Sequence, residues 1–208
     1  MKVILLNGSP NKEGCTYTAL AEVAMQLKKN GVETEILQIG KKAIQGCTAC
    51  GVCQSGNGCV FKEDLVNELL EELIHADGFI IGSPVYYASA NGSLIAFLDR
   101  LFFAGNDLHF SHKLGASVVS ARRAGTTAAL EVLNKYFTIA NMPLVSSSYW
   151  NMVHGHSPKD VRQDKEGLHT MRTLADNMAW LLKSIEAGRK AGIALPKPEP
   201  KEWTNFIR

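Results

Sequence analysis

The sequence predicts a three-layer α/β fold, in which helices cover both faces of a parallel β-sheet. Along the chain, short apolar runs of strand length alternate with amphipathic segments of helix length, which is typical of this architecture. Two of the runs, FIIG at 79–82 and ASVVS at 116–120, do not alternate between apolar and polar residues, as expected of strands buried on both faces. A chain of 208 residues with near-average apolar content is the size of one domain.

The predicted elements follow one another in regular order. Five strands are expected where apolar and β-branched residues gather in short runs, at 3–6, 33–37, 78–81, 116–120 and 144–147. Apolar residues recur at helical spacing at 16–29, 65–75, 92–103 and 126–140, and a final helix is expected at 167–188. Residues 1–188 should therefore form a single domain. Residues 189–208 should form an extended, proline-containing arm that docks on the domain or on a second subunit through Trp203, Phe206 and Ile207.

Composition and charge exclude several classes of function. The formal net charge of +2 and the pI near 8.2 give no basic field, so nucleic acid is not expected as a partner. No apolar stretch reaches the ~20 residues that a membrane-spanning helix needs, and the N-terminal apolar run is too short for a signal peptide. We therefore expect a cytoplasmic protein. In that compartment five cysteines, four of them within thirteen positions, indicate metal or redox chemistry rather than disulfides.

The first loop, NGSPNKEGCTYTAL at 7–20, has the composition of a phosphate-binding turn. It joins a buried strand to a helix, where backbone N–H groups and the positive helix end can face an anion. Five residues separate Gly8 from Gly14, so the loop is not a P-loop, and Pro10 replaces the second glycine of a dinucleotide motif. Neutral donors suit a single phosphate monoester such as that of FMN, although an ordinary capped turn shares this composition. The candidate donors are Ser9, Asn11, Thr16 and the backbone of 14–18.

Two later loops should complete the same site, because ligands of open parallel sheets bind at the carboxyl ends of the strands. The loop GSPVYYASANG at 82–92 offers an apolar and aromatic wall for an isoalloxazine ring, formed by Pro84, Val85, Tyr86 and Tyr87. The loop SARRAGTTAAL at 120–130 offers groups for the anionic edge of a reduced flavin or for nicotinamide phosphates, namely Ala121, Arg122, Arg123 and Gly125. Strand-end packing and a solvated loop are the structural alternatives.

The segment GCTACGVCQSGNGC at 46–59 carries Cys47, Cys50, Cys53 and Cys59 in the pattern C-x2-C-x2-C-x5-C. Three cysteines at intervals of three can place thiolates around one face of a 4Fe-4S cluster, and a fourth closes the site. Two alternatives stay open: zinc, which more often takes two separated C-x2-C pairs, and a loop without a cluster. Cys15 stands apart at a helix start, which would lower its pKa, and it is expected to pack against FMN rather than act as a nucleophile.

The quoted loops together resemble a known family. GSPNKEGCT at 8–16, GSPVYYASANGSLIAFLDRL at 82–101 and GASVVSARRAGTTAAL at 115–130 look like loops of the flavodoxin-like NADPH-dependent FMN reductases. The compact cysteine pattern is similar to that of the iron-sulfur flavoprotein branch. The likeness covers about residues 1–150.

The resemblance implies a five-stranded parallel sheet in order 2-1-3-4-5, noncovalently bound FMN, and a homodimer or homotetramer with FMN near a subunit interface. It also implies that 84–87 contact the ring and that the FMN phosphate is bound by Ser9, Asn11, Cys15, Thr16 and Tyr17. Many relatives carry arginine where this chain has Asn11, which removes one positive charge from the phosphate site.

From these residues and the resemblance we expect an FMN-dependent NAD(P)H oxidoreductase. NAD(P)H would give hydride to the flavin, and the acceptor would be a quinone, a nitro or azo compound, a flavin or a similar small molecule. One alternative is an electron carrier in which FMN and a 4Fe-4S cluster exchange electrons with a ferredoxin-like protein. Another is a nonenzymatic flavin sensor. No side chain is assigned as a catalytic acid or base.

Overall fold

The computed structural model describes residues 1–197, 199–200 and 202–206, with the side chains of 106–108 outside that description. Its sheet has the order β2-β1-β3-β5-β6, and β4 pairs with β3 outside this path. All pairings are parallel except that of β3 with β4. The predicted order of the five parallel strands is therefore confirmed. The strands are β1 Lys2–Asn7, β2 Glu33–Gln38, β3 Gly78–Tyr86, β4 Ser89–Ala90, β5 Leu114–Ala121 and β6 Met152–His154.

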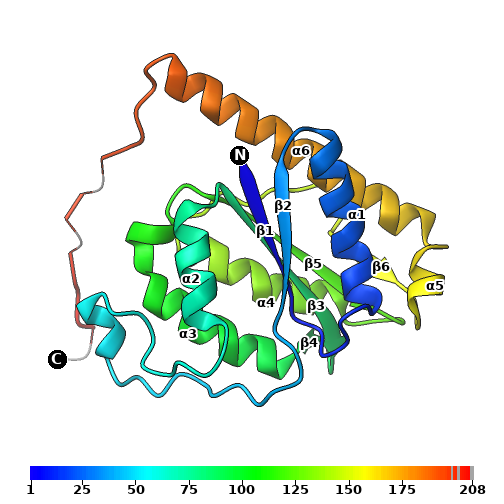
Figure 1. The fold of residues 1–208 in the computed structure, drawn as a ribbon, viewed down its shortest axis with the longest axis horizontal. Coiled ribbons are helices and arrows are strands. Elements are labelled where there is room, and N and C mark those ends of the chain that lie inside the picture. The colour runs from blue at the N-terminus through cyan, green and yellow to red at the C-terminus, as the bar shows by residue number, and fades with distance from the viewer. Residues whose placement is uncertain (198, 201, 207–208) are drawn as a thin grey trace.

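Helices lie on both faces of the sheet, as predicted (Figure 1). Alternate residues of β1 point to opposite faces, so Ile4 and Leu6 pack in one core while Val3 and Leu5 pack in the other. The first core is shared with α2, α3 and α4, and the second with α1 and α6. The helical segments are α1 Cys15–Lys29, the short 3-10 helix η1 Val52–Ser55, α2 Val66–His75, α3 Gly92–Phe110, α4 Thr126–Ile139, α5 Pro158–Val161 and α6 Lys165–Lys190.

Two strands differ from their predicted bounds by more than two residues. The third continues past Ile81 to Tyr86 and turns back into β4, so much of the expected loop 82–92 is a hairpin. The fifth was expected at 144–147, but there only Leu144 forms an isolated bridge to Gly115, and the edge strand of the sheet is β6. Residues 146–151 leave the sheet between these two contacts, which the apolar pattern alone does not indicate.

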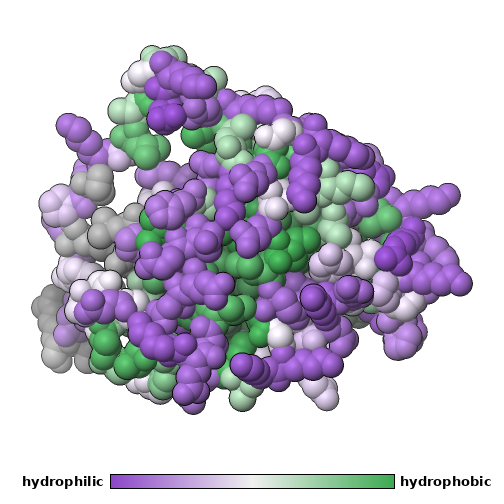
Figure 2. Space-filling model, viewed as in Figure 1, coloured by the Kyte–Doolittle hydropathy of each residue, from purple (hydrophilic) through white to green (hydrophobic). Residues whose placement is uncertain are grey.

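The surface and the C-terminal segment complete the fold. Figure 2 shows a face that is mostly hydrophilic, with apolar atoms reaching the surface near its middle. After α6 the described residues form no helix or strand, and Trp203 and Phe206 are largely exposed. Docking of this arm therefore stays a prediction, and Ile207 lies outside the described residues. No helix within the described part of the chain is long and apolar enough to cross a membrane.

Candidate functional site

Asn7, the last residue of β1, organises the first loop from beneath. Its side chain is fully buried, and its amide oxygen accepts a hydrogen bond from the backbone N–H of Ser9 over 3.1 Å. Its amide nitrogen donates to the carbonyl of Lys12 over 3.2 Å and to the side-chain oxygen of Gln38 over 2.6 Å. Gln38, at the end of β2, in turn donates to the carbonyl of Ser9. Two neighbouring strand ends therefore hold the loop in one conformation.

Asn91 fixes the same loop from the other side. Its buried amide donates to the carbonyl of Gly8 over 2.8 Å, and its backbone N–H donates to the hydroxyl of Ser83 over 3.0 Å. It also caps α3, because its side-chain oxygen accepts from the N–H of Ser93. Gly8 has no room for a side chain here, since a Cβ atom would lie 2.8 Å from the carbonyl oxygen of Gly82. The first and second loops are thus one packed unit.

The start of α1 presents backbone donors with no competing side chain. The first intrahelical bond joins the N–H of Thr18 to the carbonyl of Gly14, so the N–H groups of 15–17 precede the helical ladder. Gly14 supplies no capping side chain, and the first turn contains no acidic residue. The positive end of the helix therefore remains available to an anion. The start of α4 at Thr126 shares these features, with Gly125 as its cap residue.

The predicted phosphate residues fall into different environments. Ser9 is buried and its hydroxyl accepts from the N–H of Asn11 over 3.1 Å, so it shapes the loop from within. The hydroxyl of Thr16 is also buried, 2.8 Å from that of Ser120, which ties α1 to the end of β5. Tyr17 points elsewhere, into a surface groove beside Ile36 on β2. Its contribution to a phosphate site is thus limited to its backbone N–H.

Cys15 packs against the segment after β6, and its expected contact with FMN stays a prediction, whereas the prediction that its helix position lowers the pKa of its thiol was wrong. Partial burial raises the pKa of its thiol, and this outweighs the favourable effect of a backbone N–H. The thiol donates to the carbonyl of Gly155 over 3.6 Å, and the N–H of Gly155 donates to the carbonyl of Ala121. The segment after β6 is thereby joined to both the first and the third loop. Through Gly155, Cys15 links the first loop to the third loop.

Positive charge reaches the first loop from residues that the sequence analysis did not select. Asn11 lines an open pocket together with Gly14, and the same pocket is lined by Lys12, Lys41 and Glu13. Lys41 follows β2, so its position beside the first loop depends on the pairing of β1 with β2. The charge that Asn11 does not supply is therefore present nearby on two lysines, partly offset by one carboxylate.

The second loop is a tight hairpin whose turn residues are strained. Val85 pairs with Ala90 and Tyr86 with Ser89, which leaves Tyr87 and Ala88 as the two-residue turn. Both have positive φ angles, 51° and 58°, in the region that costs an L-residue about 1–2 kcal/mol. Tyr87 is fully exposed and Tyr86 nearly half exposed. The hairpin therefore holds two aromatic side chains out from the carboxyl edge of the sheet.

Gly125 brings the third loop against this hairpin. Its φ angle is +95°, and a Cβ atom on it would lie 2.9 Å from the Cα atom of Ala88 and 3.0 Å from the Val85 side chain. Arg122 and Arg123, which follow β5, are exposed. The structure thus brings together the three predicted loops through Asn91, Ser120 and Gly125. In a single chain the aromatic side chains face solvent.

The backbone donors at the start of α1 and the aromatic hairpin are groups that suit FMN. A phosphate would meet the backbone donors at the start of α1, and a ring would meet the hairpin and the start of α4.

The sequence analysis missed the buried amides that support the loop. Asn91 could have been found, because asparagine directly before a helix is a preferred cap residue. Asn7 and Gln38 carried no local signal, since each merely ends a strand.

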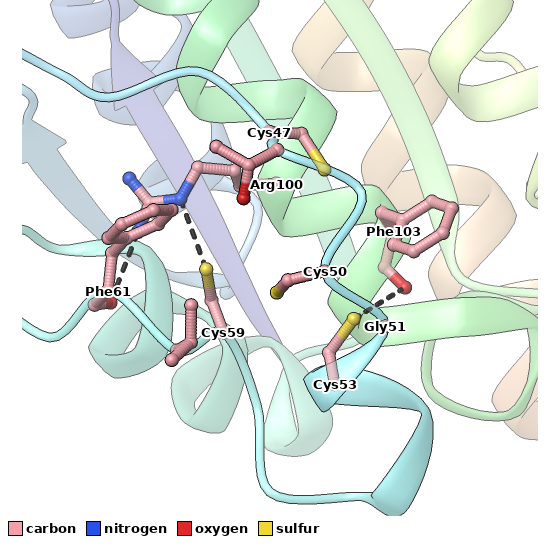
Figure 3. A pocket seen from close by; sticks show the side chains of 10 residues that line it. Cys47, Cys50, Gly51, Cys53, Cys59, Phe61, Arg100 and Phe103 are labelled. Carbon is pink, nitrogen blue, oxygen red and sulfur yellow. Dashed lines mark hydrogen bonds between the residues drawn. The ribbon is translucent and has the colours of Figure 1, made fainter.

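The four clustered cysteines line one pocket, at a distance along the chain from the loops above. Figure 3 shows their side chains around this pocket, which Phe61, Arg100 and Phe103 also line. Cys59 is buried, Cys47 and Cys50 are exposed, and all are free thiols. Burial raises the pKa of the Cys53 thiol. The ligand type and the shared pocket fit an iron-sulfur cluster.

The cysteine loop is held by Asn67 on α2. The N–H of Cys59 donates to the side-chain oxygen of Asn67 over 2.7 Å, and the Asn67 amide donates back to the carbonyls of Cys59 and Phe61. Left-handed turns at Ala49, Gly51 and Gly56 fold the remainder. Within the described residues, no group of three or more His, Cys, Asp or Glu side chains is close enough to hold a single metal ion. The four thiols thus share a pocket without forming a single-ion site.

Comparison with known proteins extends these observations. The family model described as NADPH-dependent FMN reductase matches residues 1–157. The chain is 30% identical over 193 residues to an iron-sulfur flavoprotein of Methanocaldococcus jannaschii, covering 89% of this chain and all of that protein. It is 31% identical to a second iron-sulfur flavoprotein of that organism, covering 88% and 98%, and 28% identical to one of Methanosarcina thermophila, covering 91% and 99%.

Solved structures share the fold at low sequence identity. RosB with a bound 8-demethyl-8-formylriboflavin-5'-phosphate intermediate matches with a TM-score of 0.70 at 14% identity, covering 100% of this chain and 92% of that one. A flavodoxin from the domain Archaea matches with a TM-score of 0.58 at 17% identity, covering 88% and 99%. The predicted flavodoxin-like fold is confirmed by these neighbours together with the strand order.

Proposed function

The chain belongs to the NADPH-dependent FMN reductase family and to its iron-sulfur flavoproteins, and from this we propose that it is an FMN-dependent NAD(P)H oxidoreductase. The observation that carries the proposal is the start of α1, where backbone donors without a capping side chain follow a loop that buried Asn7 and Asn91 hold through Ser9 and Gly8. Such a site suits the phosphate of FMN. The small electron acceptor would be a quinone, a nitro or azo compound, or a flavin.

Each part of the site has a separate task in this proposal. The N–H groups of 15–17 bind the phosphate, and Lys12 and Lys41 add long-range attraction. Tyr86 and Tyr87 offer an aromatic surface to the ring, while Arg122, exposed directly after β5, would offer positive charge to the ring or to a nicotinamide phosphate. When bound, FMN supplies hydride acceptance and one- or two-electron transfer, so no side chain needs to act as acid or base.

A second candidate function is electron carriage between FMN and a 4Fe-4S cluster, with a ferredoxin-like protein as partner. It is favoured by the shared pocket of Cys47, Cys50, Cys53 and Cys59, and by relatives named iron-sulfur flavoproteins that match along most of their length. These four residues would hold the cluster. The two functions are compatible, because the cluster could be the acceptor or a relay for electrons from FMN.

The exposed tyrosines also favour a homo-oligomer. Tyr87 is fully exposed, and a large aromatic side chain beside a ligand site is commonly covered in the assembled protein. The proposal is therefore a homodimer or homotetramer in the cytoplasm with FMN near a subunit interface. Sedimentation of the FMN-bound protein would report the assembly, and a monomer at all concentrations would contradict it.

A visible spectrum with iron and sulfide analysis tests both candidates on protein purified without oxygen. Flavin bands that bleach on addition of NADH or NADPH and return with a quinone support the reductase. Stoichiometric iron and sulfide support the carrier as well. Protein that lacks flavin and does not bind added FMN would contradict both. Bound FMN that no donor reduces and no acceptor reoxidises would favour a flavin sensor.

A further inference from the structure

Arg100 on α3 is buried beside the cysteine pocket. Only 1% of its surface is exposed, and it is the one charged residue in the buried class within the described part of the chain. A buried charge is costly unless it is fully paired, so its partners explain why it is tolerated. The sequence analysis gave this residue no functional role. Its neighbour Asp99 accepts a hydrogen bond from the hydroxyl of Tyr136.

All five N–H donors of Arg100 are used. Nη1 and Nη2 both donate to the carboxylate of Asp64, which neutralises the charge. Nη1 also donates to the carbonyl of Gln45 over 3.2 Å, and Nη2 to the carbonyl of Phe61 over 3.1 Å. Gln45 and Phe61 lie just outside the two ends of the cysteine loop 46–59. One guanidinium therefore ties the start of the loop to its end.

The fifth donor points at sulfur. Nε of Arg100 lies 3.1 Å from Sγ of Cys59, and the contact is visible in Figure 3. A neutral thiol is a weak acceptor, whereas a thiolate accepts a charge-assisted hydrogen bond. A guanidinium is not deprotonated in proteins, so Arg100 keeps its charge although it is buried. The donor is thus permanently charged and directed at the sulfur of a cysteine that lines the pocket.

We propose that Arg100 is the positioning residue of the cluster site, fixing Cys59 as its fourth ligand and raising the reduction potential of the cluster. The proposal rests on the cysteine pocket assigned under the proposed function. One-electron reduction adds one negative charge to the cluster and its thiolates. Hydrogen bonds to the sulfurs and local positive charge stabilise that reduced form. Asp64 limits the effect, because it balances the charge of Arg100 while leaving the Nε–H on the sulfur.

The test compares Arg100→Lys and Arg100→Met with the unaltered protein, all purified without oxygen and loaded with FMN. The cluster is titrated with dithionite and followed by electron paramagnetic resonance. Lysine keeps the charge but cannot reproduce the planar fork, so we expect Arg100→Lys to make reduction about tenfold less favourable. Arg100→Met should make reduction of the cluster still less favourable, and iron retention against a chelator should fall about 10- to 100-fold. Arg172→Lys, which alters an arginine paired with Glu22 outside the pocket, is the matched control.

Several outcomes would overturn the proposal. If Arg100→Lys folds, binds FMN and keeps the reduction potential and iron retention of the parent, Arg100 is only a structural clamp. If the Arg100 variants do not fold, Asp64→Asn decides, because it keeps the guanidinium and removes its counter-charge. The proposal expects a higher potential there, and an unchanged or lower one contradicts it. A parent protein with FMN but without iron and sulfide would remove the cluster site, and with it this role for Arg100, while leaving the reductase function standing.

Discussion

The side-chain amide of Asn91 donates a hydrogen bond to the carbonyl oxygen of Gly8 over 2.8 Å, across 83 positions of sequence. Asn91 is 7% exposed. Its side-chain oxygen also accepts a hydrogen bond from the N–H of Ser93, and its backbone N–H donates to the hydroxyl of Ser83. This one residue connects the hairpin, the start of α3 and the first loop. We expect Asn91→Ala to lower the free energy of unfolding by about 1–3 kcal/mol, because buried partners lose their hydrogen bonds. Urea denaturation of the FMN-free protein measures this, and a loss below the error of the fit would contradict it.

Asn7 should matter for FMN more than for the rest of the fold. Asn7→Ala removes the bonds to the N–H of Ser9 and to Gln38, so the loop loses its support from beneath. We expect FMN affinity to fall about tenfold or more, the equivalent of one hydrogen bond of about 1.4 kcal/mol. Quenching of FMN fluorescence on titration reports the affinity. Asn30→Ala, at the far end of α1, is the matched control and should bind FMN as the parent does.

Gly125 and Ala88 should respond in opposite directions. Gly125→Ala places a Cβ atom 2.9 Å from the Cα of Ala88 at a φ of +95°, and we expect a loss of about 2–4 kcal/mol. Ala88→Gly relieves strain at a φ of 58°, so the gain should be about 0.5–1 kcal/mol after the entropy cost of glycine. Both follow from urea midpoints. A stabilising Gly125→Ala would show that the hairpin and the third loop do not pack as described.

Cys15 should make stability depend on alkaline pH. Burial raises its pKa in the folded state, so above about pH 8.5 the unfolded chain releases this proton first. The folded state then binds more protons than the unfolded one, and the free energy of unfolding falls as pH rises. We expect Cys15→Ser to flatten this decline between pH 8 and pH 10.

Alkylation provides an independent measurement for Cys15. At pH 9 iodoacetamide should modify Cys15 more slowly in the folded protein than in urea, as followed by peptide mass spectrometry. Equal rates in the two states would mean that the thiol is neither buried nor raised in pKa. The exposed Cys47 serves as an internal control in iron-free protein and should react readily in both states.

The layer order and most helices could be predicted from local patterns. Residues 3–6 are apolar throughout, which is enough to predict a central strand, and the periodicity of 126–140 closely predicts α4. The three loops could be assigned to one site because parallel strands end at the same edge of the sheet. The cysteine pocket could be predicted from spacing alone, since short intervals leave the thiols near one another.

Other features had no local signal. Tyr87 and Ala88 occupy a turn that usually takes glycine or asparagine, so the hairpin was missed and the third strand was predicted too short. The helix position of Cys15 predicts a lowered pKa for its thiol, but partial burial in the folded chain raises that pKa instead. Arg100 lies within an ordinary helical pattern, and nothing around it in sequence indicates five partners.

The sequence by itself determined the α/β architecture, the edge of the sheet on which the candidate site lies and the identity of the clustered thiols. These depend on periodicity and spacing, which are properties of neighbouring residues. Only the tertiary structure decided which buried groups hold these regions: Asn7 with Gln38 and Asn91 with Gly8 at the first loop, and Arg100 with Cys59 at the cysteine pocket. Each pair joins segments at least 31 positions apart, and a hydrogen bond between them exists only once packing has excluded water and brought donor and acceptor together.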